Sequence, residues 1–481
     1  MSKGTPQLAA HIQLPEVDLL FHPERTQEVE MHPLRGLLKF GPYSRSLLHS
    51  VIDPIRVAIV APQGCVKPIQ LLLNELNGQH LPQERRAYLV EFPGFTRIFR
   101  VNLVCATESA IYEFPASFDE ELSSAKAPYV KLAEGLSRAL SALAQRRHEF
   151  DLVAIYLPNR WNAGFYGESE EDFDLHDYLK AIMAVRGIPT QIIREDKALS
   201  YPCRCSVAWR LSIALYCKAG GIPWKMANTD PETAYIGLSY AIRENQGHGP
   251  QFVTCCSQVF DADGAGLEFV AYETDDVYVE RENPFLSRAE MRRVMSRSLL
   301  LYQRRHSGRV PKRVVVHKST QFKHDEVEGC FDALHASEGI DLVQVQQDVG
   351  WRGVLIDAPI DDRARKGRPS NYPAYRGTCL PLDGRTTLLW TQGNAPEAVG
   401  GKNFYKEGKG IPVPLMLRRY AGHGGWESQC NAVLGLSKMN WNNDALYDRL
   451  PVTMAYARVL ARVVKRMPKL TPQTYQFRFF M

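Results

Sequence analysis

Three apolar runs joined by short links decide how the second half of this 481-residue chain folds. They read AYIGLSYAI at residues 234–242, QFVTCCSQVF at 251–260 and LEFVAYE at 267–273. All three are rich in β-branched and aromatic residues, which favour strands. Gly264 and Gly266, in the link between the second and third runs, favour a hairpin. We therefore expect three strands that follow one another along the chain.

The residues after these runs alternate between helix and strand patterns. A helix is predicted to begin after Ser287, which forms a capping box with Glu290, and to end near residue 305. A strand at 313–316, a helix at 325–337 and a strand at 340–346 follow it. Three consecutive strands and then helix, strand, helix and strand is the element order of a ribonuclease-H-like fold.

The first half of the chain has the pattern of a doubly wound α/β domain. Residues 56–60 (RVAIV), 96–103 (TRIFRVNL) and 151–157 (DLVAIYL) predict strands, and residues 67–76 and 130–147 predict helices. Strands that alternate with helices pair in parallel, with helices on both faces of the sheet. The predicted fold class is therefore α/β.

The predicted boundaries give an irregular, proline-rich segment at 1–45, a doubly wound domain at 46–222 and a ribonuclease-H-like domain at 223–481. Hydrophobic residues make up 45% of the chain and charged residues 23%, as in ordinary globular proteins. No apolar stretch reaches the roughly 18 residues that a membrane span needs, and the N-terminus lacks the pattern of a signal peptide. We expect a cytoplasmic protein with no membrane partner.

Charge and cysteine usage add two constraints. The net charge is only +5, from 58 Lys and Arg against 53 Asp and Glu, which is compatible with a nucleic-acid partner but does not require one. Between residues 363 and 385, six basic residues and two tyrosines accompany the single acid Asp383, which fits a solvated loop or a nucleic-acid contact. The ten cysteines lack the spacing of a zinc site, so we expect free thiols in a reducing compartment.

Four polar residues near the end of the first domain could gather around an anion. His176 and Lys180 are four apart and share one face of a helix that Gly187 terminates. Gln191 opens the next strand, and Lys218 lies in the last turn of a later helix. Two ammonium groups, an imidazole and an amide suit a dianion such as a terminal 5′-phosphate. Each residue also has a structural explanation, since the helix macrodipole alone favours a lysine such as Lys218.

An ordered series of segments resembles the short prokaryotic Argonautes. The segments are HPLRGLLKFGPYS at 32–44, HDYLKAIMAVRGIPTQII at 176–193, LYCKAGGIPWKM at 215–226, AYIGLSYAI at 234–242 and LSKMNWNNDALYDRLPVTMAYARVLA at 436–461. The resemblance runs from about residue 31 to residue 481 and implies a MID domain followed by a PIWI domain.

In this family a pocket of the MID domain holds the 5′-phosphate of a short guide. The residues that match the family pattern are His176, Lys180, Gln191 and Lys218. The resemblance also implies a Mg²⁺ ion at the guide phosphates, with Gln191 and the C-terminal carboxylate of Met481 as its ligands.

The resemblance provides a test for nuclease activity. Two-metal hydrolysis needs acidic ligands that converge at the ends of the central strands. At the matching positions this chain has Ser239, a poor Mg²⁺ ligand, and Lys318, whose ammonium would repel the metal. Glu268 and Tyr456 lie near the remaining positions. We expect a protein with no catalytic residues, in which Lys318 contacts a target phosphate instead.

The resemblance further implies a role in prokaryotic defence. The guide is expected to be a small RNA and the target single-stranded DNA from plasmids or phages. The partner is expected to be a second protein that carries an APAZ region and a sirtuin-like or TIR-like effector, which depletes NAD⁺ after target capture. The residues expected to contact the nucleic-acid backbone are Arg363, Arg365, Lys366, Arg368, Arg418, Arg419 and Lys438. The apolar side chains of Leu19, Leu20 and Phe21 are candidates for the partner contact.

Two alternatives stay open at the level of sequence. The chain could be an active guide-dependent endonuclease that uses other acids, such as Asp261, Asp263 or Glu268. It could also be an α/β enzyme whose phosphate pocket binds a small phosphorylated metabolite. The sequence does not distinguish RNA from DNA as guide or target, because the 2′-hydroxyl is recognised by geometry.

Overall fold

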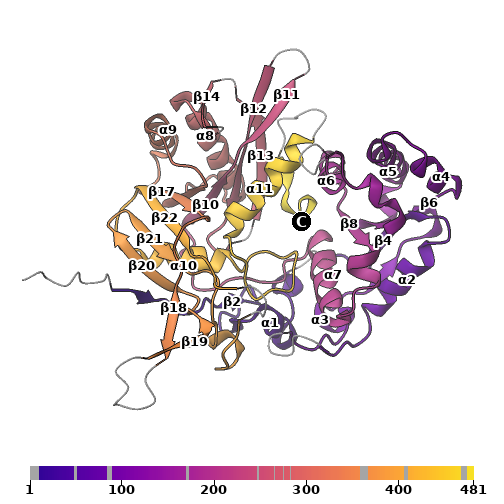
Figure 1. Cartoon of the computed structure of the whole chain (residues 1–481), viewed down its shortest axis with the longest axis horizontal. Helices are drawn as coiled ribbons and strands as arrows, with labels where there is room; N and C mark the ends of the chain where they lie inside the picture. Colours follow the sequence, from indigo (N-terminus) through magenta and orange to yellow (C-terminus); the bar gives the residue numbers. More distant parts are fainter. Residues whose placement is uncertain are drawn as a thin grey trace, which may run out of the picture.

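The computed structural model describes residues 10–47, 51–83, 89–168, 173–245, 249–264, 266–274, 276–281, 283–357, 367–405, 410–466 and 474–481. Two sheets organise these residues, and each has helices on both faces. Figure 1 shows the smaller sheet, around β4, in the right half of the molecule and the larger sheet, around β10, in the left half. All eight cysteines whose side chains are described are free thiols.

The smaller sheet is parallel throughout and has β4 at its centre. Its strands are β4 (Ile55–Pro62), β5 (Leu103–Cys105), β6 (Ile111–Phe114), β7 (Leu152–Leu157) and β8 (Thr190–Arg194). β5, β6 and β7 all pair with β4, and β8 pairs with β7. Alternate residues of β4 point to opposite faces, with Val57 and Ile59 in one core and Ala58 and Val60 in the other.

Helices cover both faces of this sheet. α2 (Val66–Glu75) and α7 (Arg204–Lys218) pack on one face, and α4 (Ser117–Ser123), α5 (Pro128–Ala144) and α6 (Leu175–Arg186) pack on the other. The predicted doubly wound arrangement is confirmed.

The larger sheet is mixed, with three parallel strands at its centre. These are β10 (Thr233–Leu238), β16 (Arg313–Lys318) and β17 (Gly339–Gln346). Beyond β10 lie the antiparallel strands β12 (Gly249–Phe260), β13 (Gly266–Glu273) and β23 (Thr474–Gln476), with β11 (Ala241–Asn245) beside β12. Beyond β17 lie β22 (Leu415–Ala421), β21 (Thr386–Leu389), β20 (Thr378–Asp383) and β1 (Ile12–Gln13).

Four helices cover the larger sheet. α8 (Arg288–Arg305) and α9 (His324–Leu334) pack on one face, against Ile236 and Val316, and α10 (Glu427–Leu436) and α11 (Val452–Lys465) pack on the other. The side chain of Ser287 caps α8 as predicted, because it accepts a hydrogen bond from the backbone N–H of Glu290. The predicted ribonuclease-H-like order of elements is confirmed.

A glycine in β10 sets how closely α11 approaches the sheet. A Cβ atom at Gly237 would lie 2.0 Å from the carbonyl oxygen of Thr453, in the first turn of α11. Only glycine fits there. The first predicted strand, 234–242, is in fact two strands, since β10 ends at Leu238 and β11 begins at Ala241.

The predicted strand at 96–103 is wrong. Phe95–Phe99 forms the short helix α3, because Phe95, Ile98 and Phe99 are buried at helical spacing. Arg100 then ends the helix with a left-handed backbone, at φ 58°. The strand β5 begins only at Leu103.

The described part of the N-terminal segment is ordered, which also differs from the prediction. β1 extends the larger sheet, β2 (Leu19–Leu20) pairs with both β3 (Val29–Glu30) and β9 (Lys225–Met226), and α1 (Pro33–Phe40) follows. The expectation that Leu19 and Phe21 are free to contact a partner is wrong, because they are only 0% and 1% exposed, whereas Leu20 is half-buried. Phe21 packs over Gly36 of α1.

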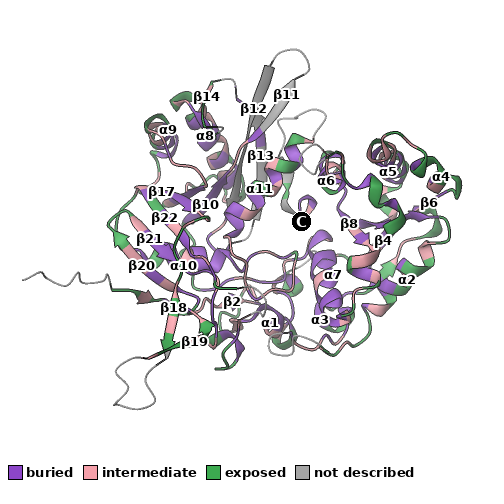
Figure 2. Cartoon of the chain, in the orientation of Figure 1, coloured by how far each residue is buried: buried purple, intermediate pink, exposed green. Residues whose placement is uncertain are grey.

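The two halves meet where the chain ends. α11 and β23 contact α6, and the terminal residues lie between α6 and α7, where Figure 1 marks the C-terminus. Figure 2 shows buried strands at the centre of both sheets, whereas the hairpin of β18 (Val354–Asp357) and β19 (Arg368–Pro373) is largely exposed. Within the described residues, no helix is long and apolar enough to cross a membrane.

Candidate functional site

The first element of the site is α6, whose ends are fixed by local sequence. The carboxylate of Asp174 caps the helix by accepting a hydrogen bond from the backbone N–H of Asp177, at 3.0 Å. Gly187 ends it with a left-handed backbone, at φ 66°, as predicted. His176 and Lys180 therefore lie one turn apart on one face, with the His176 side chain 49% exposed and Lys180 buried.

The C-terminus of the chain reaches this face of α6. The Lys180 ammonium donates a hydrogen bond to the carbonyl oxygen of Phe480, at 2.8 Å. Met481 is buried at 1% exposure, so the last residue lies inside the junction between the two halves.

A second buried lysine completes the predicted set. Lys218, in the last turn of α7, donates a hydrogen bond to Oε1 of Gln191 in β8, at 2.6 Å. The Gln191 amide nitrogen donates to the carbonyl oxygen of Ile192, at 3.0 Å. Of the four predicted residues, Lys218 and Gln191 are therefore hydrogen-bonded to each other. Lys180 is hydrogen-bonded to Phe480 in the C-terminal segment instead.

The pKa values of these groups show that their positive charges are poorly compensated. Burial lowers the pKa of Lys180 to about 8, although Asp177 opposes this shift. Burial and the nearby Lys180 lower the pKa of Lys218 well below its usual range. The nearby positive charge of Lys180 also lowers the pKa of the half-exposed His176 imidazole, which favours its neutral form. In the described part of the chain, neither lysine forms an ion pair with a carboxylate. An anion placed between them would supply the missing negative charge.

The same residues do not fit a resident divalent cation. Oε1 of Gln191 already accepts a hydrogen bond from the ammonium of Lys218. A metal cation at this oxygen would lie close to the positive charges of Lys218 and Lys180. The expected role of Gln191 as a Mg²⁺ ligand is therefore possible only with an anion in the site. The carboxylate of Met481 is the other expected ligand, and the structure places that residue at this junction.

A pocket of about 700 Å³ opens beside His176, at the carboxyl ends of β7 and β8. In doubly wound sheets, ligands bind outside the carboxyl ends of the strands. Its basic lining residues come from both halves of the molecule and are Arg194, Arg462, Lys465 and Arg466. Lys465 and Arg466 lie three and four residues after Arg462, near the end of α11. This helical spacing of basic residues is the sequence pattern that could have predicted them as one basic surface.

One further group at this pocket resembles a metal site. Ligand atoms of Asp174, His176 and Asp177 lie within 4.8 Å of one another, and this is the one such group of His, Cys, Asp or Glu in the described ranges. However, Asp174 caps α6 and Asp177 pairs with Arg462 at 3.0 Å. These contacts give the carboxylates a structural role.

Comparison with solved structures identifies the architecture. The chain is similar to Clostridium butyricum Argonaute bound to a guide DNA and a 19-mer target DNA, with a TM-score of 0.62 and 15% identity. The match covers 98% of this chain and 55% of that one. The chain has an Argonaute-like fold.

Other Argonaute structures give the same result. A crystal structure of A. aeolicus Argonaute matches with a TM-score of 0.59 and 16% identity, and Aa-Ago with externally bound siRNA matches with 0.62 and 15%. Each match covers 98% of this chain and 56% of the other. The chain therefore spans little more than half the length of these Argonautes, in the part consistent with MID and PIWI domains. No family model and no curated protein matches the sequence.

Lys318 is enclosed rather than presented to a ligand. It ends β16 at 0% exposure and forms an ion pair with the equally buried Glu326 of α9. The rings of Tyr240, Phe285 and Phe322 surround its ammonium at 4.9–5.4 Å. The expected contact of Lys318 with a target phosphate is therefore wrong, because no phosphate can reach it in this fold.

The other residues considered for nuclease chemistry are dispersed or occupied. Ser239 directly follows β10, and the buried Tyr456 donates a hydrogen bond to Asn440, at 2.9 Å. Asp261 pairs with His306 and Asp263 with Lys225. The side chain of Glu268 lies outside the described residues.

The residues predicted to contact the nucleic-acid backbone differ in their exposure to solvent. Arg363, Arg365 and Lys366 lie outside the described residues, whereas Arg368 and Arg418 are exposed. The predictions for Arg419 and Lys438 are wrong, because both side chains are buried in structural contacts. Arg419 stacks on Trp426 and donates to Gln429, and Lys438 pairs with Glu16 at 2.7 Å.

Proposed function

We propose that this chain holds a short guide strand by its 5′-phosphate and captures a complementary target by base pairing. One observation carries the proposal: Lys180 and Lys218 are buried close together, and neither has a carboxylate partner among the described residues. A phosphate dianion would accept charge-assisted hydrogen bonds from both ammonium groups. The amide of Gln191 and the neutral imidazole of His176 would fix its orientation.

The adjoining pocket suits the next nucleotides of the guide. Arg194, Arg462 and Lys465 provide cations at its wall, and His176, one turn of α6 away from the buried Lys180, lines this pocket. Contacts between such cations and phosphates give affinity without sequence preference, so recognition of the target is left to base pairing. The similar C. butyricum structure holds a guide and a target, which supports this use of the fold.

We propose that the chain does not cut its target. Ser239 stands where a metal-binding acid is expected, and Lys318 is held in a buried ion pair with Glu326. Any Mg²⁺ would be bound through the guide phosphates together with the carboxylate of Met481.

The wider role is proposed from the family resemblance. The guide is a small RNA, the target is single-stranded DNA of a plasmid or phage, and the setting is prokaryotic defence in the cytoplasm. The partner proposed from the resemblance is an APAZ-containing protein. Its sirtuin-like or TIR-like domain would deplete NAD⁺ when a target is captured.

The decisive experiment compares two RNAs of about 20 nucleotides that differ only in a 5′-phosphate or a 5′-hydroxyl. The wild-type chain should prefer the phosphorylated RNA, and the double variant Lys180→Gln, Lys218→Gln should lose this preference. Lys312→Gln is the matched control, since it removes an exposed lysine that pairs with Glu232. Equal affinity of the wild-type chain for both RNAs would contradict the proposal.

Two further measurements address the alternatives. Cleavage of a complementary target in the presence of guide and Mn²⁺ would show an active endonuclease. The absence of short nucleic acid from the purified protein, together with tight binding of a small phosphorylated metabolite, would favour the metabolic enzyme.

A further inference from the structure

The helix α8 and the residues directly after it carry a concentration of arginine. Seven arginines lie between residues 288 and 309, with one acid, Glu290, and no lysine. Met291, Val294 and Leu301 of this helix pack in the core of the larger sheet. Its other side and the residues after it expose Arg292, Arg304 and Arg309 to solvent. A solvated helix face usually mixes charges of both signs, so solubility alone does not explain this composition.

Neighbouring carboxylates neutralise the start of α8 but not its end. Arg288 pairs with Asp332 of α9, at 2.6 Å. In the ranges that the structure describes, Arg304 and Arg309 form no ion pair. The helix macrodipole favours a cation in the last turn and so accounts for Arg304, but Arg309 lies four residues beyond the end of the helix. The arginines at this end of α8 are therefore available to an anion.

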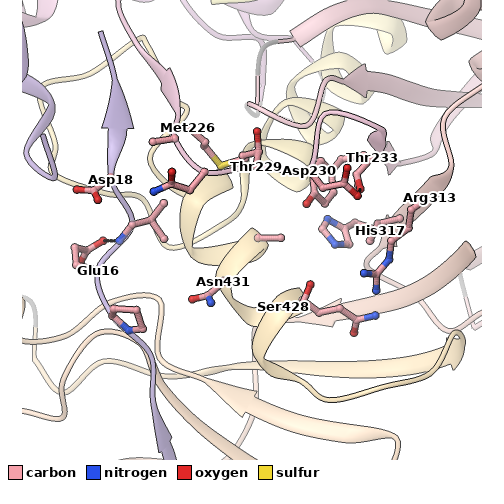
Figure 3. Close-up of a pocket in the computed structure, with 18 of the residues that line it drawn as sticks. Glu16, Asp18, Met226, Thr229, Asp230, Thr233, Arg313, His317, Ser428 and Asn431 are labelled. Carbon is pink, nitrogen blue, oxygen red and sulfur yellow. Dashed lines mark hydrogen bonds between the residues drawn. The ribbon is translucent and has the colours of Figure 1, made fainter. Parts of the chain in front are cut away.

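This surface lies on the opposite face of the larger sheet from the candidate guide site. Figure 3 shows His317 of β16 beside Asn431 of α10, around a cavity. His317 is also hydrogen-bonded to Thr453 in the first turn of α11, so α10 and α11 cover this face. Val316, the preceding residue of β16, points to the other face, where α8 packs. Because Lys465 of the guide pocket belongs to α11, the arginines of α8 form a separate surface, and Figure 1 shows α8 away from the marked C-terminus.

The chemistry and the shape of this surface fit the backbone of a nucleic acid. A guanidinium group binds two phosphate oxygens at once, which an ammonium does not. Twelve residues separate Arg292 from Arg304, so the two lie about 18 Å apart along the helix, the axial length of about five nucleotides. The outer side of a helix is convex and cannot enclose a small anion. A long polyanion that contacts several guanidinium groups at once would bind more tightly.

We propose that the arginine face of α8, which comprises Arg292, Arg297, Arg304 and Arg309, binds the phosphate backbone of the target strand outside the segment paired with the guide. The inference rests on the proposed function, because it assumes a target that is captured by a guide. A plasmid or phage strand continues well beyond the roughly 20 paired nucleotides, and a flexible single strand can follow the surface of the protein. Phosphate contacts carry no sequence preference, so this face would hold the flank of any target.

Two DNA targets with the same guide-paired segment test the proposal. One has only the paired segment, and the other adds about 40 thymidines at each end, long enough at 3.4 Å per nucleotide to reach across the chain. The guide-loaded wild-type chain should bind the longer DNA about tenfold more tightly at about 50 mM salt, and this advantage should disappear at about 500 mM. The triple variant Arg292→Gln, Arg304→Gln, Arg309→Gln should bind both DNAs equally.

Two controls separate this proposal from the proposed function. The triple variant should keep the preference for a 5′-phosphorylated guide, because the candidate guide site is unchanged. Without any guide, it should bind oligo(dT) more weakly than the wild-type chain does, a result that does not depend on the guide site. The charge-matched variant Arg45→Gln, Arg97→Gln, Arg138→Gln removes exposed arginines outside α8 and should retain the advantage of the longer DNA.

Three results would overturn the proposal. The first is equal affinity of the wild-type chain for both DNAs while its preference for a 5′-phosphorylated guide is intact, which would leave the proposed function in place. The second is an advantage of the longer DNA, or a binding of oligo(dT), that the folded triple variant retains in full. The third is displacement of the flank by poly-L-glutamate more readily than by oligo(dT) of equal charge, since the surface would then suit an acidic protein.

Discussion

At the scale of single residues, the buried lysines of the smaller half are the unusual feature. The ammonium groups of Lys180 and Lys218 donate to a backbone carbonyl and to an amide, whose dipoles compensate a full charge only in part. Such a charge destabilises the folded protein until an anion binds. A lysine kept in this position is therefore explained by ligand binding better than by stability.

Replacing Lys218 separates its effect on the stability of the fold from its effect on ligand binding. Lys218→Met removes the buried charge and retains the aliphatic stem, so the protein free of nucleic acid should melt at a higher temperature. The same variant should bind 5′-phosphorylated RNA roughly 10- to 100-fold more weakly, because a charge-assisted hydrogen bond is lost. Thermal melting and a binding titration measure both quantities. A lower melting temperature with unchanged affinity would indicate a purely structural lysine.

The low pKa of Lys180 predicts a specific pH dependence. Its pKa is about 8 in the folded chain and near 10.4 in the unfolded chain, so the unfolded state binds more protons between these values. The free energy of unfolding of the ligand-free protein should therefore rise as the pH increases from about 8 towards 10. Affinity for a 5′-phosphate should fall over the same range, because the ammonium loses its proton. Lys180→Met should abolish both trends, and their persistence in that variant would assign them to another group.

At the scale of elements, Lys318 and Glu326 join β16 to α9. Glu326 accepts hydrogen bonds from Lys318, from the hydroxyl of Tyr240 and from the backbone N–H groups of Leu286 and Lys323. One carboxylate thus satisfies donors from several segments, which ties the end of the strand to the start of the helix. This arrangement is structural and leaves no room for a metal ion at Lys318.

Removing one partner of the Lys318–Glu326 ion pair should destabilise the folded protein. Glu326→Gln leaves the Lys318 ammonium buried without a counter-charge and should destabilise the protein by about 3–5 kcal/mol. The double variant Lys318→Met, Glu326→Gln should recover part of this loss, because no buried charge remains. Denaturant unfolding measures both. Loss of guide or target affinity in a double variant that is still folded would revive a direct role for Lys318.

At the scale of the whole molecule, the candidate guide site lies where the two halves meet. α6 and β8 belong to the smaller sheet, whereas Arg462 and Lys465 belong to α11 of the larger half. The C-terminal segment returns to α6 and supplies the acceptor for Lys180 from a residue 300 positions away. The site therefore exists only when both halves are folded and in contact.

Salt dependence tests the basic wall of this junction. Binding of a guide should weaken as the salt concentration rises, and Lys465→Ala and Arg462→Ala should each reduce the slope of log K against log salt by about 1. The preference for a 5′-phosphate should remain, since Lys180 and Lys218 are unchanged. Affinity that does not vary with salt would rule out this wall as a phosphate-binding surface.

The sequence predicted the ends of helices well where a single residue type determines the end. Gly187 ended α6 and Ser287 capped α8 as expected, because glycine and serine act there through their own backbone and side-chain bonds. The predicted strand at 96–103 is wrong because the apolar residues of this segment fit a strand as well as a short helix. The positive φ of Arg100 that ends this helix has no signal in the sequence.

The sequence by itself determined the two α/β halves and brought His176, Lys180, Gln191 and Lys218 to attention, because residue type and spacing along a helix or strand act locally. Only the tertiary structure decided which cations are available to a ligand. Lys465 is exposed at the pocket beside His176, whereas Lys318 and Lys438 are enclosed by their partners Glu326 and Glu16. The reason is that burial and ion pairing join residues distant along the chain, and these contacts decide whether a charge stabilises the fold or remains free to bind an anion.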